Sequence, residues 1–161
     1  MNERNTDVIS PYLGEIRWNA SCELEFPAGL PGFERYRRMV PVEIHSQRPL
    51  IYLQSAEQGD VCFLTLPVLA VYAGFELRLS EDERAALELD PPSEAAREKP
   101  ALGTDVLCLA LLVPSGATVR TNLDAPIVIN LHNGRGIQAV APAPAAGSFR
   151  LGDRGAWEPL C

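Results

Sequence analysis

The sequence predicts an all-β fold, a small antiparallel β-barrel of about eight or nine strands with one short helix. Three observations lead to this prediction. Apolar and polar residues alternate with period two in several segments, short apolar runs end at clusters of Gly, Pro and Asn, and no strand is followed by a long helix of the kind that joins parallel strands. The 161 residues fit one domain, which we place at 13–141.

The clearest strand signal is the stretch GEIRWNASCELEFP. Every second residue from Ile16 to Phe26 is apolar, and those between are polar or charged. This alternation predicts one long, half-buried strand. Residues 1–12 before it are predicted to be a flexible leader, and the Pro- and Gly-rich residues 27–34 after it a structured loop.

Three more strands are predicted before the middle of the chain, at 39–44, 49–56 and 61–68. Pro41 favours an edge position for the first of them, because proline cannot donate to a strand ladder. The residues Gln58-Gly59-Asp60 have turn chemistry and predict that the second and third strands form a hairpin.

One helix is predicted, at 81–89. It follows an alternating segment at 75–79, and Ser80 stands three residues before Glu83, which is the spacing of a capping box. Residues 90–103 are rich in proline and charge and are predicted to be an exposed connection.

Four further strands are predicted, at 105–114, 117–123, 125–131 and 136–142. The first is apolar at nearly every position, so both of its faces should be covered. The Asn- and Gly-rich residues 132–136 predict a turn between the last two. Residues 142–161, rich in Pro, Gly and Ala, are predicted to be a mobile tail.

Composition and charge restrict the class of partner. The chain is 47% apolar and 22% charged, as soluble globular proteins are. Its net charge of -7 argues against direct nucleic-acid binding, which needs an excess of Lys and Arg. The acidic balance serves either solubility or the attraction of a basic protein partner. Without a long apolar run or a signal-peptide pattern, we expect no membrane span and a cytoplasmic location.

No residue pattern predicts catalysis, and we expect no enzyme, metal or cofactor. The cysteines are isolated, which argues against a zinc site and a disulfide framework. Neither His45 nor His132 has a second ligand at a metal spacing. Two alternatives stay open, a small β-barrel hydrolase using Cys62 or His132, and a structural barrel that assembles with itself. A monomer is the default expectation.

Two motifs carry a resemblance to a known family. FPAGLPGFE occupies 26–34 and TNLDAPIVIN occupies 121–130, and the stretch PLIYLQSAEQGDVCFLTLPV at 49–68 lies between them. In order and spacing these segments resemble the flagellar assembly factor FliW family over roughly residues 13–141. The resemblance implies a small β-barrel that is not an enzyme. It also implies two protein partners, flagellin and the carbon storage regulator CsrA, a basic dimeric RNA-binding protein. Members relieve CsrA repression of flagellin translation, and flagellin competes for them.

The expected partner-binding residues are acidic side chains that would attract CsrA, together with residues of the two motifs. They are Phe33, Glu34, Glu57, Asp60, Asn122, Leu123, Asp124, Pro126, Ile127 and Asn130. For the second motif another interpretation stays open. Asn122 and Asn130 could cap turns, and the branched residues 127–129 could belong to the core.

Overall fold

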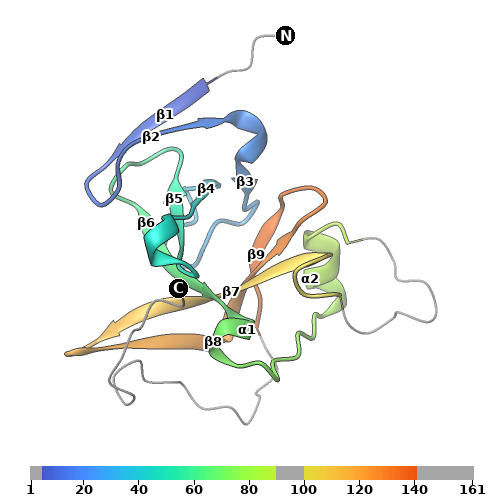
Figure 1. Ribbon diagram of the computed structural model, residues 1–161. Helices are drawn as coiled ribbons and strands as arrows, with labels where there is room; N and C mark the ends of the chain where they lie inside the picture. The colour runs from blue at the N-terminus through green and yellow to red at the C-terminus, as the bar shows by residue number, and fades with distance from the viewer. Residues whose placement is uncertain (1–4, 90–99, 141–161) are drawn as a thin grey trace.

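One antiparallel sheet dominates the computed structural model, which describes residues 5–89 and 100–140 (Figure 1). Within these residues it has seven strands, each hydrogen-bonded to the next in sequence order. They are β3 (Leu24–Glu25), β4 (Arg38–Val42), β5 (Ile51–Ser55), β6 (Cys62–Pro67), β7 (Val106–Ser115), β8 (Thr118–Asn130) and β9 (Gly136–Gln138). The predicted hairpins β5–β6 and β8–β9 are both confirmed.

The two ends of the sheet approach each other. In an antiparallel meander with an odd number of strands, the first and last strands run in the same direction, and Glu25 indeed forms a parallel bridge with Arg135. The Glu25 N–H donates to the carbonyl of Gly134 at 2.9 Å. The sheet is therefore a nearly closed barrel, and the predicted all-β fold is confirmed.

The N-terminal residues correct the predicted leader. Residues 5–10 form β1 (Asn5–Ser10), which pairs along its whole length with β2 (Gly14–Asn19). Gly14 has a φ of 76° in the turn between them, a conformation that glycine adopts readily. The hairpin lies against the β5–β6 turn, where Gly59 is so close to the carbonyl oxygen of Ile9 that no Cβ would fit. Pairing and packing therefore order a segment whose polar sequence suggested a flexible end.

The predicted long strand is interrupted. β2 ends at Asn19, and a 3₁₀ helix (Ala20–Cys22) precedes β3. The side chain of Asn19 accepts the N–H of Ser21 at 3.0 Å, and the Trp18 indole donates to Glu23 at 3.0 Å across the turn. These local side-chain bonds favour a turn over a continuous ladder, although the apolar alternation runs through it unchanged.

The predicted helix is present but shorter. α2 (Glu81–Ala86) has the full capping box, with the Glu83 N–H donating to Ser80 at 3.1 Å and the Ser80 N–H donating to Glu83 at 2.8 Å. It ends before residue 89, because Glu88 takes a left-handed φ of 52°. A second helix, α1 (Val68–Val71), and a 3₁₀ helix (His45–Gln47) were not predicted.

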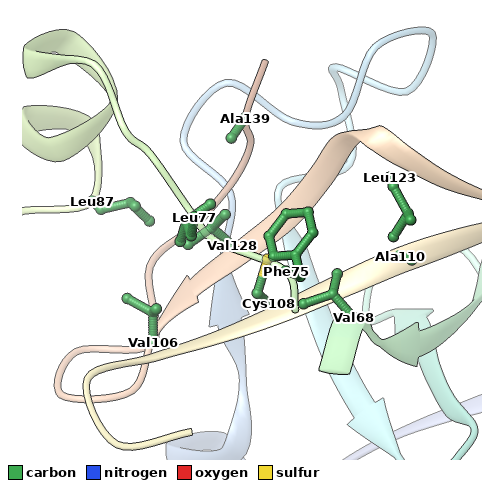
Figure 2. Packing of buried hydrophobic residues seen from close by; sticks show 10 residues of the cluster. All are labelled: Val68, Phe75, Leu77, Leu87, Val106, Cys108, Ala110, Leu123, Val128 and Ala139. Carbon is green, nitrogen blue, oxygen red and sulfur yellow. The ribbon is translucent and has the colours of Figure 1, made fainter. Parts of the chain in front are cut away.

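Two hydrophobic clusters cover opposite faces of β7 and β8. Figure 2 shows the first, in which Val68, Phe75 and Leu77 gather over Cys108 and Val128. The second consists of buried side chains from the first motif, β4, β5, β7 and β8. They are Phe26, Leu30, Met39, Ile51, Leu53, Leu109, Ile127 and Ile129. The prediction that both faces of the apolar strand are covered is confirmed. Among the described residues, no helix is long and apolar enough to span a membrane.

Candidate functional site

The second motif forms a bulge in β8 and not two separate strands. Leu109 pairs with Ile127, and Leu111 pairs with Asn122. Between these two pairs β7 contributes only Ala110, while β8 contributes residues 123–126. The extra residues leave the ladder and bend the strand, so the two strands predicted at 117–123 and 125–131 are one bulged strand.

Side-chain hydrogen bonds hold the bulge. The Asn122 side chain accepts the N–H groups of Asp124 and Ala125, both at 3.1 Å. Pro126 has no N–H to satisfy, and its carbonyl accepts the N–H of Ala139 at 2.8 Å. The interpretation of Asn122 as a turn cap is therefore correct. Asp124 is left exposed at the bulge.

Four of the expected partner-binding residues lie in the interior. Leu123 is 2% exposed, Ile127 0% and Asn130 3%, and Pro126 is also buried. Asn130 donates to the carbonyl of Leu87 at 2.9 Å and accepts the N–H of His132 at 2.9 Å, so it ties the sheet to the end of α2. Side chains buried in this way offer a partner no surface, and we leave these four out of the docking surface discussed below.

The first motif folds into a tight loop that exposes an aromatic ring. Gly29 has a φ of 66°, and a Cβ on it would lie 2.5 Å from the backbone of Glu34. The Phe33 side chain is 38% exposed and meets Phe63 edge-on, with ring centroids 5.0 Å apart. The Glu34 carboxylate accepts the N–H of Gly32 at 2.8 Å, and this bond lowers the pKa of Glu34.

Glu57 and Asp60 belong to the neighbouring β5–β6 hairpin. Glu57 accepts the N–H of Arg37 at 3.1 Å and pairs with the Arg38 guanidinium at 3.3 Å. Arg38 also pairs with Glu23 at 3.3 Å. Asp60 is exposed and forms no ion pair within the described part of the chain. Glu57 is therefore partly neutralised, whereas Asp60 keeps its charge available.

The expected residues thus form two groups. One group combines Phe33 and Glu34 of the first-motif loop with Glu57 and Asp60 of the β5–β6 hairpin, because the Phe33–Phe63 and Arg37–Glu57 contacts join this loop to the hairpin. We call this the loop surface. Asn122 and Asp124 lie on the bulge, and over residues 5–89 and 100–140 no hydrogen bond or ion pair links them to the loop surface.

The sequence could not reveal Phe63 as a neighbour of Phe33. Phe63 lies in an apolar strand, and its period-two position indicates only which face of the sheet it occupies. The contact depends on the route of the first-motif loop, which positive-φ glycines determine. No local pattern carries that information.

The cysteines and histidines within residues 5–89 and 100–140 do not assemble a nucleophile and a base. Burial raises the pKa of Cys62 to about 11 and that of Cys108 to about 12, so both are neutral thiols at physiological pH. His132 lies 3.5 Å from Asp105, whose pKa is lowered first by the N–H of Ala101 and then by His132. The described residues contain no cluster of His, Cys, Asp and Glu that could hold a metal ion.

A comparison with protein families decides what this barrel is related to. The model of the family described as FliW protein matches residues 7–147. The chain belongs to the FliW family. The resemblance inferred from the two motifs is confirmed.

Individual relatives agree with this FliW assignment. The flagellar assembly factor FliW of Azoarcus sp. is 35% identical over 139 residues, which cover 83% of this chain and 89% of the relative. That of Thermosipho africanus is 32% identical over 130 residues, covering 80% and 83%. A crystal structure of the flagellar assembly factor FliW superimposes with a TM-score of 0.71 at 23% identity, over 86% of this chain and 91% of that one. This last likeness supports the fold.

Proposed function

We propose that this FliW-family chain is a non-catalytic regulator that binds CsrA and relieves its repression of flagellin translation. Flagellin is the competing partner, so the level of free flagellin controls how much of the chain is left to bind CsrA. The protein would act in the cytoplasm, where translation takes place. Family membership is the observation that carries this proposal.

The loop surface supports the choice of a basic partner. Glu34 and Asp60 are exposed, and the lowered pKa of Glu34 keeps its carboxylate charged well below neutral pH. The net charge of -7 adds a long-range attraction for a basic protein. Phe33 offers a partly exposed aromatic anchor of the kind that dominates protein interfaces. Asp124, on the bulge, contributes a further exposed carboxylate.

The hydrolase alternative has no comparable support. The thiol of Cys62 is kept neutral by burial, and among the described residues the hydrogen-bonding partner of the His132 ring is the carboxylate of Asp105. A catalytic cysteine needs a neighbouring base that draws off its proton. No observation favours assembly of the barrel with itself.

The test is isothermal titration calorimetry of the protein against CsrA and, separately, flagellin from the same organism. We expect binding to both partners, and binding to CsrA should weaken when salt rises from about 0.05 M to about 0.5 M, because exposed charges are then screened. Absence of heat with both partners, for a protein shown to be folded, would reject the proposal.

A charge-reversal pair tests the loop surface itself. The double variant Glu34→Lys, Asp60→Lys should lower the affinity for CsrA at least about tenfold. Two substitutions elsewhere are the matched control: Glu43→Lys, just after β4 and paired with exposed Arg48, combined with Asp82→Lys in α2. Equal weakening by the control pair would mean that net charge, and not this surface, determines affinity.

A further inference from the structure

The turn end of the β1–β2 hairpin exposes two large apolar side chains. Ile9 is 78% exposed and Tyr12 is 67% exposed, and among the large apolar residues that the structure describes only Val140, at 75%, is comparable. We call residues 9–13 the hairpin tip, and Figure 1 shows the hairpin at the top of the view. Neither side chain contributes to the core of the barrel, so the fold does not explain why both are apolar.

The two faces of the hairpin differ in what they contact. Val8 pairs with Ile16, so these two side chains share one face, and Val8 lies 3.5 Å from the Cβ position of Gly59 in the β5–β6 turn. Ile9 pairs with Glu15 and lies on the opposite face, because successive side chains of a strand alternate. The hairpin therefore packs onto the barrel through its inner face and leaves Ile9 uncovered.

Hydrogen bonds hold the tip in one conformation. The buried Ser10 hydroxyl accepts the N–H groups of Tyr12 and Leu13, both at 3.2 Å. Pro11 has a ring that fixes its φ, and Gly14 closes the three-residue loop with a φ of 76°. A loop that is ordered before binding loses little conformational entropy when a partner docks, which favours its use as a contact surface.

The tip adjoins the turn that carries part of the loop surface. Gly59 contacts the carbonyl of Ile9, and Asp60 is the next residue in the chain. Consecutive Cα atoms are about 3.8 Å apart, so Asp60 follows directly on the point of contact. The same turn meets the first-motif loop through the hydrogen bond from Arg37 to Glu57. A protein that covers the loop surface is therefore within reach of the tip.

The charges around the tip indicate a basic partner. Asp7 is exposed on the same face as Ile9. Its cross-strand neighbour Arg17 is paired with Glu15, at 2.7 Å. Within residues 5–89 and 100–140 neither Asp7 nor Asp60 forms an ion pair. A segment that combines apolar side chains with Lys or Arg complements this surface, whereas a second copy of this chain has the same net charge of -7 and is repelled.

We propose that the hairpin tip is a contact surface for CsrA, the basic partner of the loop surface. Ile9 and Tyr12 pack against apolar side chains of CsrA, and Asp7 and Asp60 lie opposite its Lys or Arg residues. This inference rests on the proposed function. It adds to that function a set of contacts from a part of the chain that lies outside both sequence motifs.

Isothermal titration calorimetry of the full chain against CsrA tests this. The double variant Ile9→Thr, Tyr12→Gln removes both apolar groups and keeps a β-branched residue in β1. We expect its affinity for CsrA to fall at least about tenfold, while its midpoint of unfolding in urea stays that of the parent. The matched control is Val140→Thr, Leu131→Gln, which removes two exposed apolar groups elsewhere; Val140 is bonded to Glu83 of α2. The affinity of this control should stay within about twofold of the parent.

Single substitutions at Tyr12 separate contact from folding. Tyr12→Phe keeps the ring and should keep the affinity, while Tyr12→Gln should lower it, and this pair decides if the double variant unfolds more easily. Unchanged affinity of the tip variants, or an equal loss in the control, would overturn this inference alone. So would weaker binding of the tip variants to flagellin with normal binding to CsrA, which would assign the tip to flagellin. A parent protein that binds no CsrA would overturn the proposed function as well.

Discussion

The close approach at Gly29 makes a quantitative prediction about the first-motif loop. A Cβ at this position would lie 2.5 Å from Glu34 Cα and 2.7 Å from the Glu34 carbonyl oxygen. Both atoms are backbone, so no side-chain rotation can relieve the contact. Gly32 in the same loop also has a positive φ, 85°, but nothing lies within 4 Å of its Cβ position. Comparing the two alanine variants separates the close approach from the conformational strain.

The magnitudes follow from these two contributions. A left-handed conformation costs a residue with a Cβ about 1–2 kcal/mol, and both variants incur it. Forcing extra volume into a packed site typically costs a further 1–3 kcal/mol, and only Gly29→Ala incurs that. We therefore expect the free energy of unfolding to fall by about 2–5 kcal/mol for Gly29→Ala and by about 1–2 kcal/mol for Gly32→Ala.

Equilibrium unfolding in urea, followed by circular dichroism and Trp fluorescence, measures both values. The slope of free energy against urea should stay unchanged, since the same surface is exposed on unfolding. If the two variants lose the same stability within the error of the extrapolation, the 2.5 Å approach does not constrain the loop and our description of it is wrong.

Three other predictions concern single side chains. Asn130→Ala should cost about 1–3 kcal/mol in urea unfolding, because the His132 N–H loses its side-chain acceptor and the Leu87 carbonyl keeps the longer bond from Asn133 at 3.2 Å. Glu88→Gly should raise the melting temperature and add about 0.5–1 kcal/mol to the free energy of unfolding. The reason is that relief of the left-handed φ outweighs loss of the exposed ion pair with Arg135. An unchanged or lower melting temperature would contradict this. At pH 8 iodoacetamide should modify exposed Cys22 well before Cys62, whose raised pKa of about 11 leaves little thiolate, as peptide mass mapping would show.

Much of the fold could be predicted because most elements are encoded locally. Turn residues between two alternating segments specified the β5–β6 hairpin, and the spacing of Ser80 and Glu83 specified the start of α2. The continuous run of apolar residues at 105–114 correctly indicated that both faces of β7 are covered. In each case the physical cause lies within a few residues of the feature.

The sequence predictions were wrong where contacts with distant residues, or competing local interactions, determine the secondary structure. β1 is ordered by its pairing with β2 and its packing on Gly59, neither of which is visible in residues 1–12. The strand predicted at 61–68 ends at Pro67, and Val68 instead begins α1. Residues 75–79 keep the alternating burial of a strand, with Phe75 and Leu77 buried, yet they pair with no strand among the described residues.

In the candidate site, too, the motifs that are recognisable in the sequence include many residues that shape the fold and are not available to a partner. Several residues that carry the resemblance are interior: Phe26 and Leu30 of the first motif share a cluster with Ile127 and Ile129 of the second. The two motifs therefore meet inside the barrel and determine its shape, so substituting them should disturb folding and binding together. Exposed residues that the motifs hold in place, such as Phe33, are where binding can be changed while stability is kept. If Phe33→Ala keeps its stability and loses affinity for CsrA, Phe33 contacts the partner. If the variant loses stability and affinity together, Phe33 serves the fold of the loop.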